Sequence, residues 1–507
     1  SSLPSLGIGK TSCREEMKVY GRHEETEYWF SDPSLPSYKR LGKFCAENQI
    51  CVDIISAVEG HGELATLSLV PQKTGGELIH YQSFKGGSAY DEHRLREDIF
   101  RLLCSNVALE AVLKIRCSEG LRVFAVHGPG YVKGDASEVN IAAVGEDLTF
   151  VATFEYTQDI EDERSNAFLQ VSLLHTTLEG KRCVRVMNIQ LPLTSQLSSV
   201  FRHSDIDTVT NLLCRKSVRQ IYEGAKGTEG APRKLTTIRD SMLSRVIKIL
   251  YAYRKYCATA SSSGQLILPE ALKFLPLMSL ALAKSVWLRS NNSTCVSPDI
   301  RVDERAYFLF LLNGASPALF ASTMYPYLFR LDEIKSEHGR PHDPNDDGGS
   351  KVNADEVRMP RPEYPSSEHL TEMGLVLLVC GLDMYFWVGR KVLKSTLHDL
   401  FGRNTLPSTE EKLQRLHFAP RANPFSKRIH AIINALKKRL AVNMTRFRMH
   451  IVKQKSGIDQ SGNPDAFVHG EDRFLSLLVE DKSKNGMSHV EMLCHIHKNI
   501  QAKMSEF

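Results

Sequence analysis

Residues 7–12, which read GIGKTS, have the composition of the end of a phosphate-binding loop. Such a loop needs a glycine five residues before the glycine of its Gly-Lys pair, so that free backbone N–H groups surround the phosphate. Pro4 stands at that position and offers no backbone N–H. We therefore expect no nucleotide site and no catalytic role for Lys10.

The histidines and cysteines show no spacing that suits a metal ion or a catalytic centre. His495 and His497 are two residues apart in a predicted helix, where side chains at that spacing point in different directions. Eleven cysteines are scattered without a CxxC pair, which favours free thiols in a reducing compartment over disulfides or zinc. We predict that the protein is not an enzyme, and that this chain holds no metal and no other cofactor.

Basic side chains are the better candidates for binding. Arg182 and Arg185 lie in a predicted strand, and the planar fork of arginine can bind a carboxylate or an anionic headgroup. The densest basic cluster comprises Lys437, Lys438, Arg439, Arg446 and Arg448. A solvated surface is the alternative for both groups, and contact with a membrane or a partner is the sharper hypothesis.

The two arginines must be positioned by a β-hairpin, which we predict over residues 168–192 (FLQVSLLHTTLEGKRCVRVMNIQLP). Residues 178–181 form its turn, because Gly180 can adopt the positive φ that such a turn needs. In the second strand Arg185 shares a face with Cys183 and Met187, while Val184 and Val186 occupy the other face.

Other periodic patterns predict several domains. Helices at 38–46, 63–69 and 91–105 alternate with strands at 50–55 and 77–81, which is typical of an α/β layer with a parallel sheet. Residues 121–193 are strand-like and predict a β-sandwich, and apolar residues recur at helical spacing from 237. After a polar segment at 338–365, we predict further elements: a hairpin at 374–388, a basic helix at 425–441, a strand at 444–452, and helices at 474–479 and 490–504.

Composition sets broad bounds. A chain of 507 residues is too long for one core, so three or four domains are expected. The formal net charge of +5 is compatible with a solvated surface or with weak attraction to an anionic membrane, and we expect no nucleic-acid partner. The most apolar stretch, 266–288, contains Pro269, Glu270 and Lys273, so it is a poor membrane span. We expect a soluble protein with at most peripheral membrane contact.

The predicted hairpin also resembles one in a known family. Its sequence is similar to a β-sandwich hairpin of the Sec24 family, the cargo-adaptor subunits of the COPII vesicle coat. Five further segments resemble that family in the same order along the chain, one of them most like the animal C/D class: 67–76, 253–275, 325–332, 381–389 and 478–496.

The resemblance implies a multidomain α+β fold, with the C-terminal half of a von Willebrand A-like α/β trunk, a β-sandwich, a helical domain and a gelsolin-like α/β domain. The corresponding segments are 1–120, 121–235, 236–340 and 341–460, and helices in 461–507 would pack back on the helical domain. The family begins with a disordered region, a zinc ribbon and the first half of the trunk, none of which is visible here. We therefore expect an N-terminally incomplete chain, with the family's structural zinc outside it.

The resemblance also implies a function. A member of this family pairs with Sec23, binds cytosolic tails of cargo and SNARE proteins, and meets the outer COPII coat indirectly. It acts in the cytoplasm, peripherally on endoplasmic reticulum exit sites and COPII vesicles. We predict cargo contacts at Arg182, Arg185 and Arg473, the last being five positions before the LVED run. For Arg473 the alternative is an exposed arginine at the start of a helix. The predicted partner interface, for which an internal turn is the alternative, comprises Pro71, Gln72, Thr74, Gly75 and Gly76.

Three other identities stay open from the sequence. Sec23 is a close paralogue, although the segments at 325–332 and 478–496 favour Sec24. A gelsolin-type actin-binding protein would repeat the gelsolin-like module, which occurs once here. A von Willebrand A adhesion protein would carry a DxSxS metal motif, which is absent from the sequence.

Overall fold

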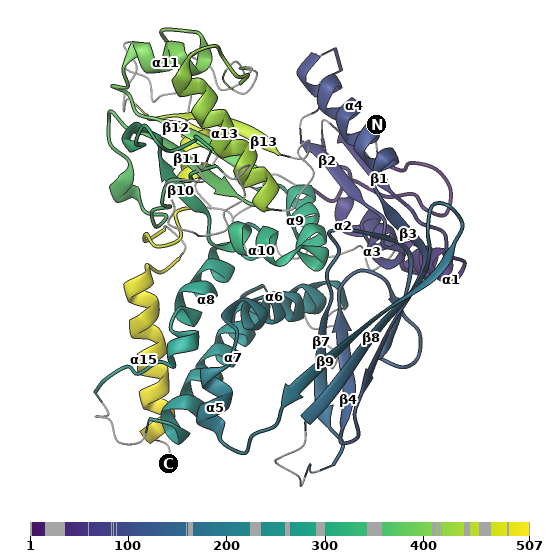
Figure 1. The fold of residues 1–507 in the computed structure, drawn as a ribbon. Coiled ribbons are helices and arrows are strands. Elements are labelled where there is room, and N and C mark those ends of the chain that lie inside the picture. The colour runs from purple at the N-terminus through teal and green to yellow at the C-terminus, as the bar shows by residue number, and fades with distance from the viewer. Residues whose placement is uncertain are drawn as a thin grey trace. The chain divides into compact units, whose positions relative to one another are not determined.

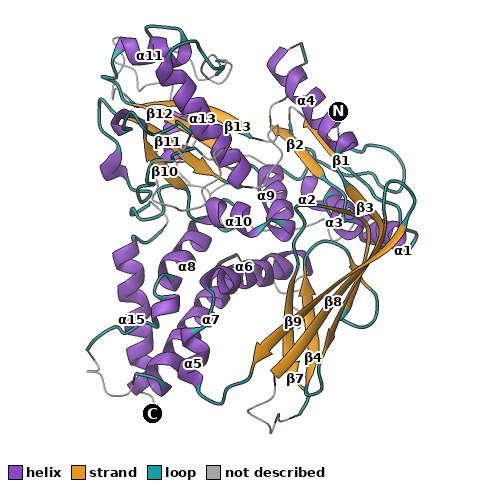
Figure 2. Cartoon of the chain, viewed as in Figure 1, coloured by secondary structure: helices purple, strands orange, loops and turns teal. Residues whose placement is uncertain are grey.

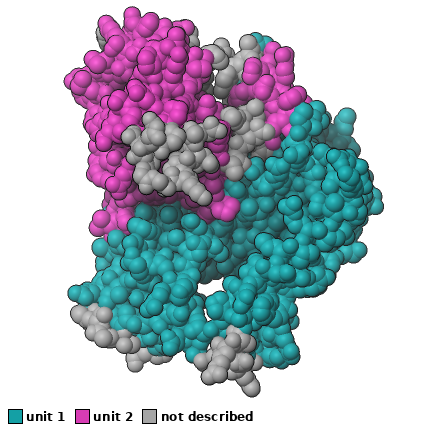
Figure 3. All heavy atoms as spheres, viewed as in Figure 1, with its two compact units in different colours: residues 1–91, 102–316, 491–507 teal, residues 92–101, 317–490 magenta. Residues whose placement is uncertain are grey.

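The structure is a computed structural model, and its described residues form two compact units (Figure 3). Unit 1 takes in residues 1–91, 102–316 and 491–507, and unit 2 takes in 92–101 and 317–490. The described residues are 3–15, 36–58, 60–82, 84, 86–87, 89–158, 160, 166–223, 235–258, 264–289, 300–341, 357–407, 413, 416, 418–440, 447–455, 468–483 and 486–505.

An α/β layer opens the chain. Its elements are α1 (Pro36–Glu47), β1 (Ile54–Val58), α2 (Leu64–Leu67), α3 (Leu69–Thr74), β2 (Leu78–Gln82) and α4 (Ala89–Cys104). β1 and β2 pair in parallel, which requires a crossover connection, and α2 and α3 provide it. α1 packs against α3. The predicted helices, strands and parallel pairing are confirmed, with ends shifted by a few residues.

A β-sandwich follows in unit 1. Its strands are β3 (Val107–Cys117), β4 (Leu121–His127), β5 (Tyr131–Val132), β6 (Glu138–Gly145), β7 (Val151–Tyr156), β8 (Asn166–Thr176) and β9 (Arg182–Pro192). Five strands form one antiparallel sheet in the order β5-β6-β3-β8-β9, and β4 pairs with β7 in the other. Side chains that alternate along the strands, such as Ala111, Leu113 and Ile141, form the buried hydrophobic core. Its first strand, β3, lies before the strand-like stretch that the sequence pattern indicates from residue 121.

Helices complete unit 1 (Figure 1). They are α5 (Leu197–Arg202), α6 (Ile206–Glu223), α7 (Leu235–Tyr256), the 3₁₀ turn η3 (Glu270–Leu272), α8 (Leu275–Lys284), α9 (Val302–Gly314) and, from Glu491 onward, α15 (His489–Ser505). α8 is apolar almost all round, and its Leu275 and Leu282 are fully buried. A helix of this kind belongs in a protein core.

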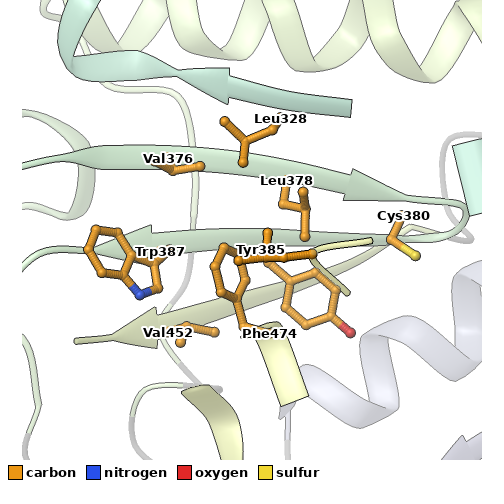
Figure 4. Packing of buried hydrophobic residues seen from close by; sticks show 9 residues of the cluster. Leu328, Val376, Leu378, Cys380, Tyr385, Trp387, Val452 and Phe474 are labelled. Carbon is orange, nitrogen blue, oxygen red and sulfur yellow. The ribbon is translucent and has the colours of Figure 1, made fainter. Parts of the chain in front are cut away.

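Unit 2 is built on a four-stranded sheet in the order β10-β11-β12-β13. Its elements are α10 (Pro317–Met324), β10 (Tyr327–Arg330), η4 (Leu331–Glu333), η5 (Ser367–His369), β11 (Leu375–Cys380), β12 (Asp383–Val388), α11 (Lys394–Phe401), α13 (Pro424–Arg439), β13 (Arg448–Lys453) and α14 (Val468–Leu475). β11 and β12 form the predicted hairpin, and β13 joins β12 in parallel. Tyr385, Trp387 and Phe474 pack on one face of this sheet (Figure 4).

The two units group the chain differently from the five predicted segments. β10 lies in the unit 2 sheet, and Phe474 and Leu478 pack on that sheet, while Glu491–Phe507 belongs with the helices of unit 1. The residue boundaries of the predicted domains therefore stay predictions. Among the described residues, no helix combines the length and apolar character needed to cross a membrane.

Candidate functional site

In the predicted hairpin, β9 is mostly exposed and β8 is mostly half-buried. β8 and β9 pair over eleven residues each, from Thr176 beside Arg182 to Asn166 beside Pro192, and Gly180 in the turn has φ of 80°. β9 forms the edge of its sheet (Figure 2). Val184 is 62% exposed on one face and Met187 is 56% exposed on the other, so neither face of this strand is covered by described residues.

Arg182 and Arg185 are both exposed, but they have different surroundings. Arg182 donates hydrogen bonds to the backbone oxygen of Glu110 (2.9 Å) and to Thr176 Oγ1 (2.8 Å). Arg185 has no hydrogen bond or ion pair to any described residue. Since side chains alternate along a strand, the two arginines lie on opposite faces of β9. The two guanidinium groups therefore do not face the same ligand. Arg185 is the more available of the two for binding a carboxylate, because Arg182 already has partners.

Arg473, the third predicted contact, lies in α14 of unit 2 beside a buried carboxylate. Asp383 bonds Arg448 and His450, each at 2.7 Å. Burial alone would raise the pKa of Asp383, but Arg448, His450 and Arg473 together hold that pKa well below its ordinary value. Burial also lowers the pKa of His450, whose ring stacks on Tyr385 at 4.6 Å. Half-buried Arg473 therefore helps to keep the carboxyl group of Asp383 ionised.

In the C-terminal segment that resembles the family, two carboxylates accept hydrogen bonds from other parts of unit 2. Glu480 accepts a hydrogen bond from Tyr325 Oη at 2.6 Å. Asp481 accepts two, at 2.8 Å each, from Ser366 Oγ and from the backbone N–H of Ser367. The two carboxylates thus connect the C-terminal segment to residues 325 and 366–367, which are distant in sequence.

The predicted partner interface at residues 71–76 is largely internal. Pro71, Thr74, Gly75 and Gly76 are buried, and Gln72 is half-buried. Gly75 ends α3 with φ of 80°, and a Cβ there would lie 2.2 Å from the backbone oxygen of Ala143 in β6. The structure thus favours the alternative of an internal turn between α3 and the sandwich. A contact with a second subunit at these residues stays a prediction.

A buried charged cluster in unit 1 was not anticipated from the sequence. His61 Nε2 lies 2.9 Å from Glu63 and His61 Nδ1 lies 3.4 Å from Asp303, while Arg14 pairs with Glu63 from the other side. Burial would lower the pKa of His61, but its bonds to Asp303 and Glu63 raise it to about 10. Asp303 is in α9, so the cluster joins the α/β layer to the helices. In the sequence, only the close spacing of His61 and Glu63 hints at this cluster.

The other chemical motifs have structural roles where they are described. In the GIGKTS segment Lys10 N–H bonds the Gly7 oxygen and Thr11 N–H bonds the Pro4 oxygen, so these amides close a turn. His495 and His497 lie on α15 as predicted. Among the described residues, no three His, Cys, Asp or Glu side chains come together as metal ligands. Of the basic cluster, Arg446 lies outside the described residues, and Arg448 is bound to Asp383.

The fold is that of a multidomain protein, with an α/β layer, a β-sandwich and helices in unit 1 and a four-stranded sheet in unit 2. Models of three domains match this chain in sequence order: the Sec23/Sec24 trunk domain at residues 1–103, the beta-sandwich domain at 108–194 and the helical domain at 205–321. The chain belongs to the Sec23/Sec24 family. The predicted fold class is confirmed.

The relatives indicate the branch within this family. Protein transport protein SEC24 B of Arabidopsis thaliana is 30% identical over the whole chain, and Protein transport protein Sec24C of Homo sapiens is 29% identical. The chain covers 41% of the length of each. The crystal structure of the human COPII-coat protein Sec24c matches 99% of this chain and 60% of that one, with a TM-score of 0.80 and 27% identity. The predicted resemblance to Sec24, with a relative in the C/D class, is confirmed.

Proposed function

We propose that this chain is part of a Sec24-type subunit of the COPII coat, which acts by binding and has no catalytic activity. One observation carries the proposal: three family domains follow one another on a chain whose fold matches human Sec24c over 99% of its length. The chain's relatives bear the name protein transport protein. A binding role is also supported by the uncovered faces of β9.

As such a subunit, the protein pairs with a Sec23-type paralogue and binds sorting signals in the cytosolic tails of cargo and SNARE proteins. It works on the cytoplasmic side of the endoplasmic reticulum, at exit sites and on COPII vesicles. Contact with the outer coat is indirect. The net charge of +5 supports a weak, peripheral contact with anionic lipid. The family's structural zinc is expected outside this chain.

The test is co-expression of the protein with a tagged Sec23-type subunit, followed by affinity capture and size-exclusion chromatography. We expect a 1:1 complex that persists at about 0.5 M salt, since stable subunit interfaces do not depend on screened surface charges alone. The protein alone, passed over the same resin, is the control for retention. Failure to recover a complex with stable, folded protein would contradict the proposal.

Actin co-sedimentation tests the remaining alternative from the gelsolin-like module. We expect the protein to stay in the supernatant with filamentous actin, with and without calcium, while gelsolin from a commercial source pellets in parallel. Saturable pelleting that calcium controls would favour an actin-binding protein instead.

A further inference from the structure

Helix α9 is held at both of its ends by buried charged side chains. At its start, Asp303 is 4% exposed and accepts hydrogen bonds from two backbone N–H groups within residues 62–64 of the α/β layer. At its end, Arg215 of α6 is 1% exposed and donates to two backbone oxygens within residues 313–315. The start of a helix carries a partial positive charge and its end a partial negative charge, so each side chain has the sign that suits its position.

Arg215 uses all five of its N–H donors, although none of them bonds a carboxylate of the described residues. Its Nε–H donates to Asn211 Oδ1 at 2.7 Å, within α6. The other four donors reach Thr149 Oγ1 and the backbone oxygens of Thr149 (2.9 Å), Asn313 and Ala315 (3.0 Å). Burial lowers the pKa of Arg215 to about 10, so the side chain is still a cation at neutral pH. These oxygens and the C-terminal end of α9 therefore compensate a charge that is otherwise costly to bury.

Thr149 brings the sandwich into the same contact. It lies between β6 and β7, its backbone N–H bonds the oxygen of Gly314 at 3.2 Å, and its Oγ1 donates to the oxygen of Ala315. The approach is close, since a Cβ built on Gly314 would lie 3.0 Å from Leu148 Cδ2. Three elements thus meet at Arg215: α6, the end of α9 and a turn of the sandwich. None of them can withdraw without leaving buried donors or acceptors unsatisfied.

We propose that α9 ties the α/β layer to the sandwich, and that Arg215 is the positioning residue that fastens its sandwich end. Joined domains usually open and move separately unless a strong interface couples them. With Arg215 in place, the layer, the sandwich and the helices of unit 1 open only together. Without it the sandwich opens by itself, while Asp303 still holds α9 on the layer. All of these contacts lie within unit 1, so the tie does not depend on the proposed function.

Native-state hydrogen exchange, read by mass spectrometry at increasing low concentrations of denaturant, measures this coupling. The slowest amides of β3 and β6 report on the sandwich, those of β1 and β2 on the layer, and those of α7 and α8 on the helices. In the wild type we expect the three groups to exchange at the same rate, because they open in one cooperative step. In Arg215→Met the sandwich amides should exchange roughly ten- to hundredfold faster than the other two groups, since buried acceptors at the contact lose their donors.

Three further variants separate coupling from stability. Leu250→Ala removes a fully buried side chain of α7 away from the contact, so it should accelerate all three groups of amides alike. Thr149→Val removes only one hydroxyl and should accelerate the sandwich amides by a smaller factor, which keeps the test open if Arg215→Met does not fold. Arg215→Lys keeps the charge, but its three donors on one nitrogen cannot reach all the acceptors, so an intermediate effect is expected. Far-ultraviolet circular dichroism and melting temperature confirm that each variant is folded.

Three results would overturn the proposal. Equal acceleration of all three groups in Arg215→Met would show that this residue contributes only to global stability, and that the packing of α6 against β4 and β7 holds the sandwich. Sandwich amides that already exchange faster than helix amides in the wild type would show that unit 1 opens domain by domain despite the contact. Faster exchange confined to the helix amides in Leu250→Ala would lead to the same conclusion.

Discussion

Charged residues inside this protein are paired across long stretches of sequence. Asp383 is 2% exposed and faces Arg448 and His450 from a neighbouring strand. A buried charge is tolerated when its partners and hydrogen bonds are complete, and loss of one partner leaves the others uncompensated. Single substitutions in such clusters therefore report how far each unit depends on them.

Asp383→Asn should destabilise unit 2 by about 3–5 kcal/mol, because Arg448 loses its buried counterion. Since the folded state lowers the pKa of Asp383, its stabilising effect is present above the ordinary pKa near 3.8 and is lost as the pH falls below it. Chemical denaturation at pH 7 and at decreasing pH measures both effects. The exposed Glu337→Gln is the control, and an equal loss of stability in that variant would contradict the assignment.

His61 should make the stability of unit 1 fall in alkaline solution. Its folded pKa is raised to about 10 from 6.5, so the stabilisation is fully present below pH 6.5 and is lost as the pH approaches 10. Denaturant midpoints between pH 6.5 and 10 test this, with His61→Gln expected to show a shallower dependence in that range. Parallel curves for the variant and the wild type would exclude His61 as the source.

Two elements turn at glycines with the same backbone angle but different surroundings. Gly75 ends α3 and Gly180 closes the β8–β9 turn, each with φ of 80°. Nothing lies within 4 Å of a Cβ built on Gly180, whereas on Gly75 it would lie 2.2 Å from the oxygen of Ala143. Alanine substitutions at the two glycines therefore separate two contributions to the free energy of unfolding, the backbone conformation and the close packing.

Gly180→Ala should lower the free energy of unfolding by about 1–2 kcal/mol, because a left-handed conformation is unfavourable for a residue with a Cβ. Gly75→Ala should lower the free energy of unfolding by the same amount and by about 1–3 kcal/mol more, because α3 or β6 must shift to relieve the overlap. Urea unfolding of both variants gives the comparison. If Gly75→Ala instead left stability unchanged and weakened binding to a Sec23-type subunit, the predicted partner contact would be favoured over the internal turn.

Local patterns in the sequence predicted the elements better than they predicted the site. The β8–β9 hairpin follows from alternation and Gly180, and α4 follows from apolar residues at helical spacing over 91–105. The cluster of His61 and Asp303 could not be predicted, since its members are 242 residues apart in number and meet only through folding. Arg473 was placed by resemblance alone, and its nearness to Asp383 depends on how α14 packs on β13.

At the scale of the whole molecule, the described residues form two units, and each unit has a hydrophobic core of its own. Trp287 is buried in unit 1 and Trp387 in unit 2, each 1% exposed. Trp387 Nε1 donates a hydrogen bond to Glu471 within its own unit. Chains with more than one compact unit often unfold in more than one step, so each tryptophan can report on its own core.

We expect separate unfolding transitions in variants that retain one of these two buried reporters. Trp287→Phe leaves fluorescence from unit 2, and Trp387→Phe leaves fluorescence from unit 1; Trp29 lies outside the described residues and is replaced by Phe in both. Adding Asp383→Asn should move the transition seen by Trp387 to lower denaturant, because that carboxylate lies in the same unit. The transition seen by Trp287 should stay within experimental error, since distant substitutions without shared partners act independently. His61→Gln provides the reverse experiment and should move only the transition seen by Trp287. If both reporters shifted together in each variant, the two units would unfold as one cooperative body, and the stability of the sandwich and helices would depend on the sheet that carries Asp383.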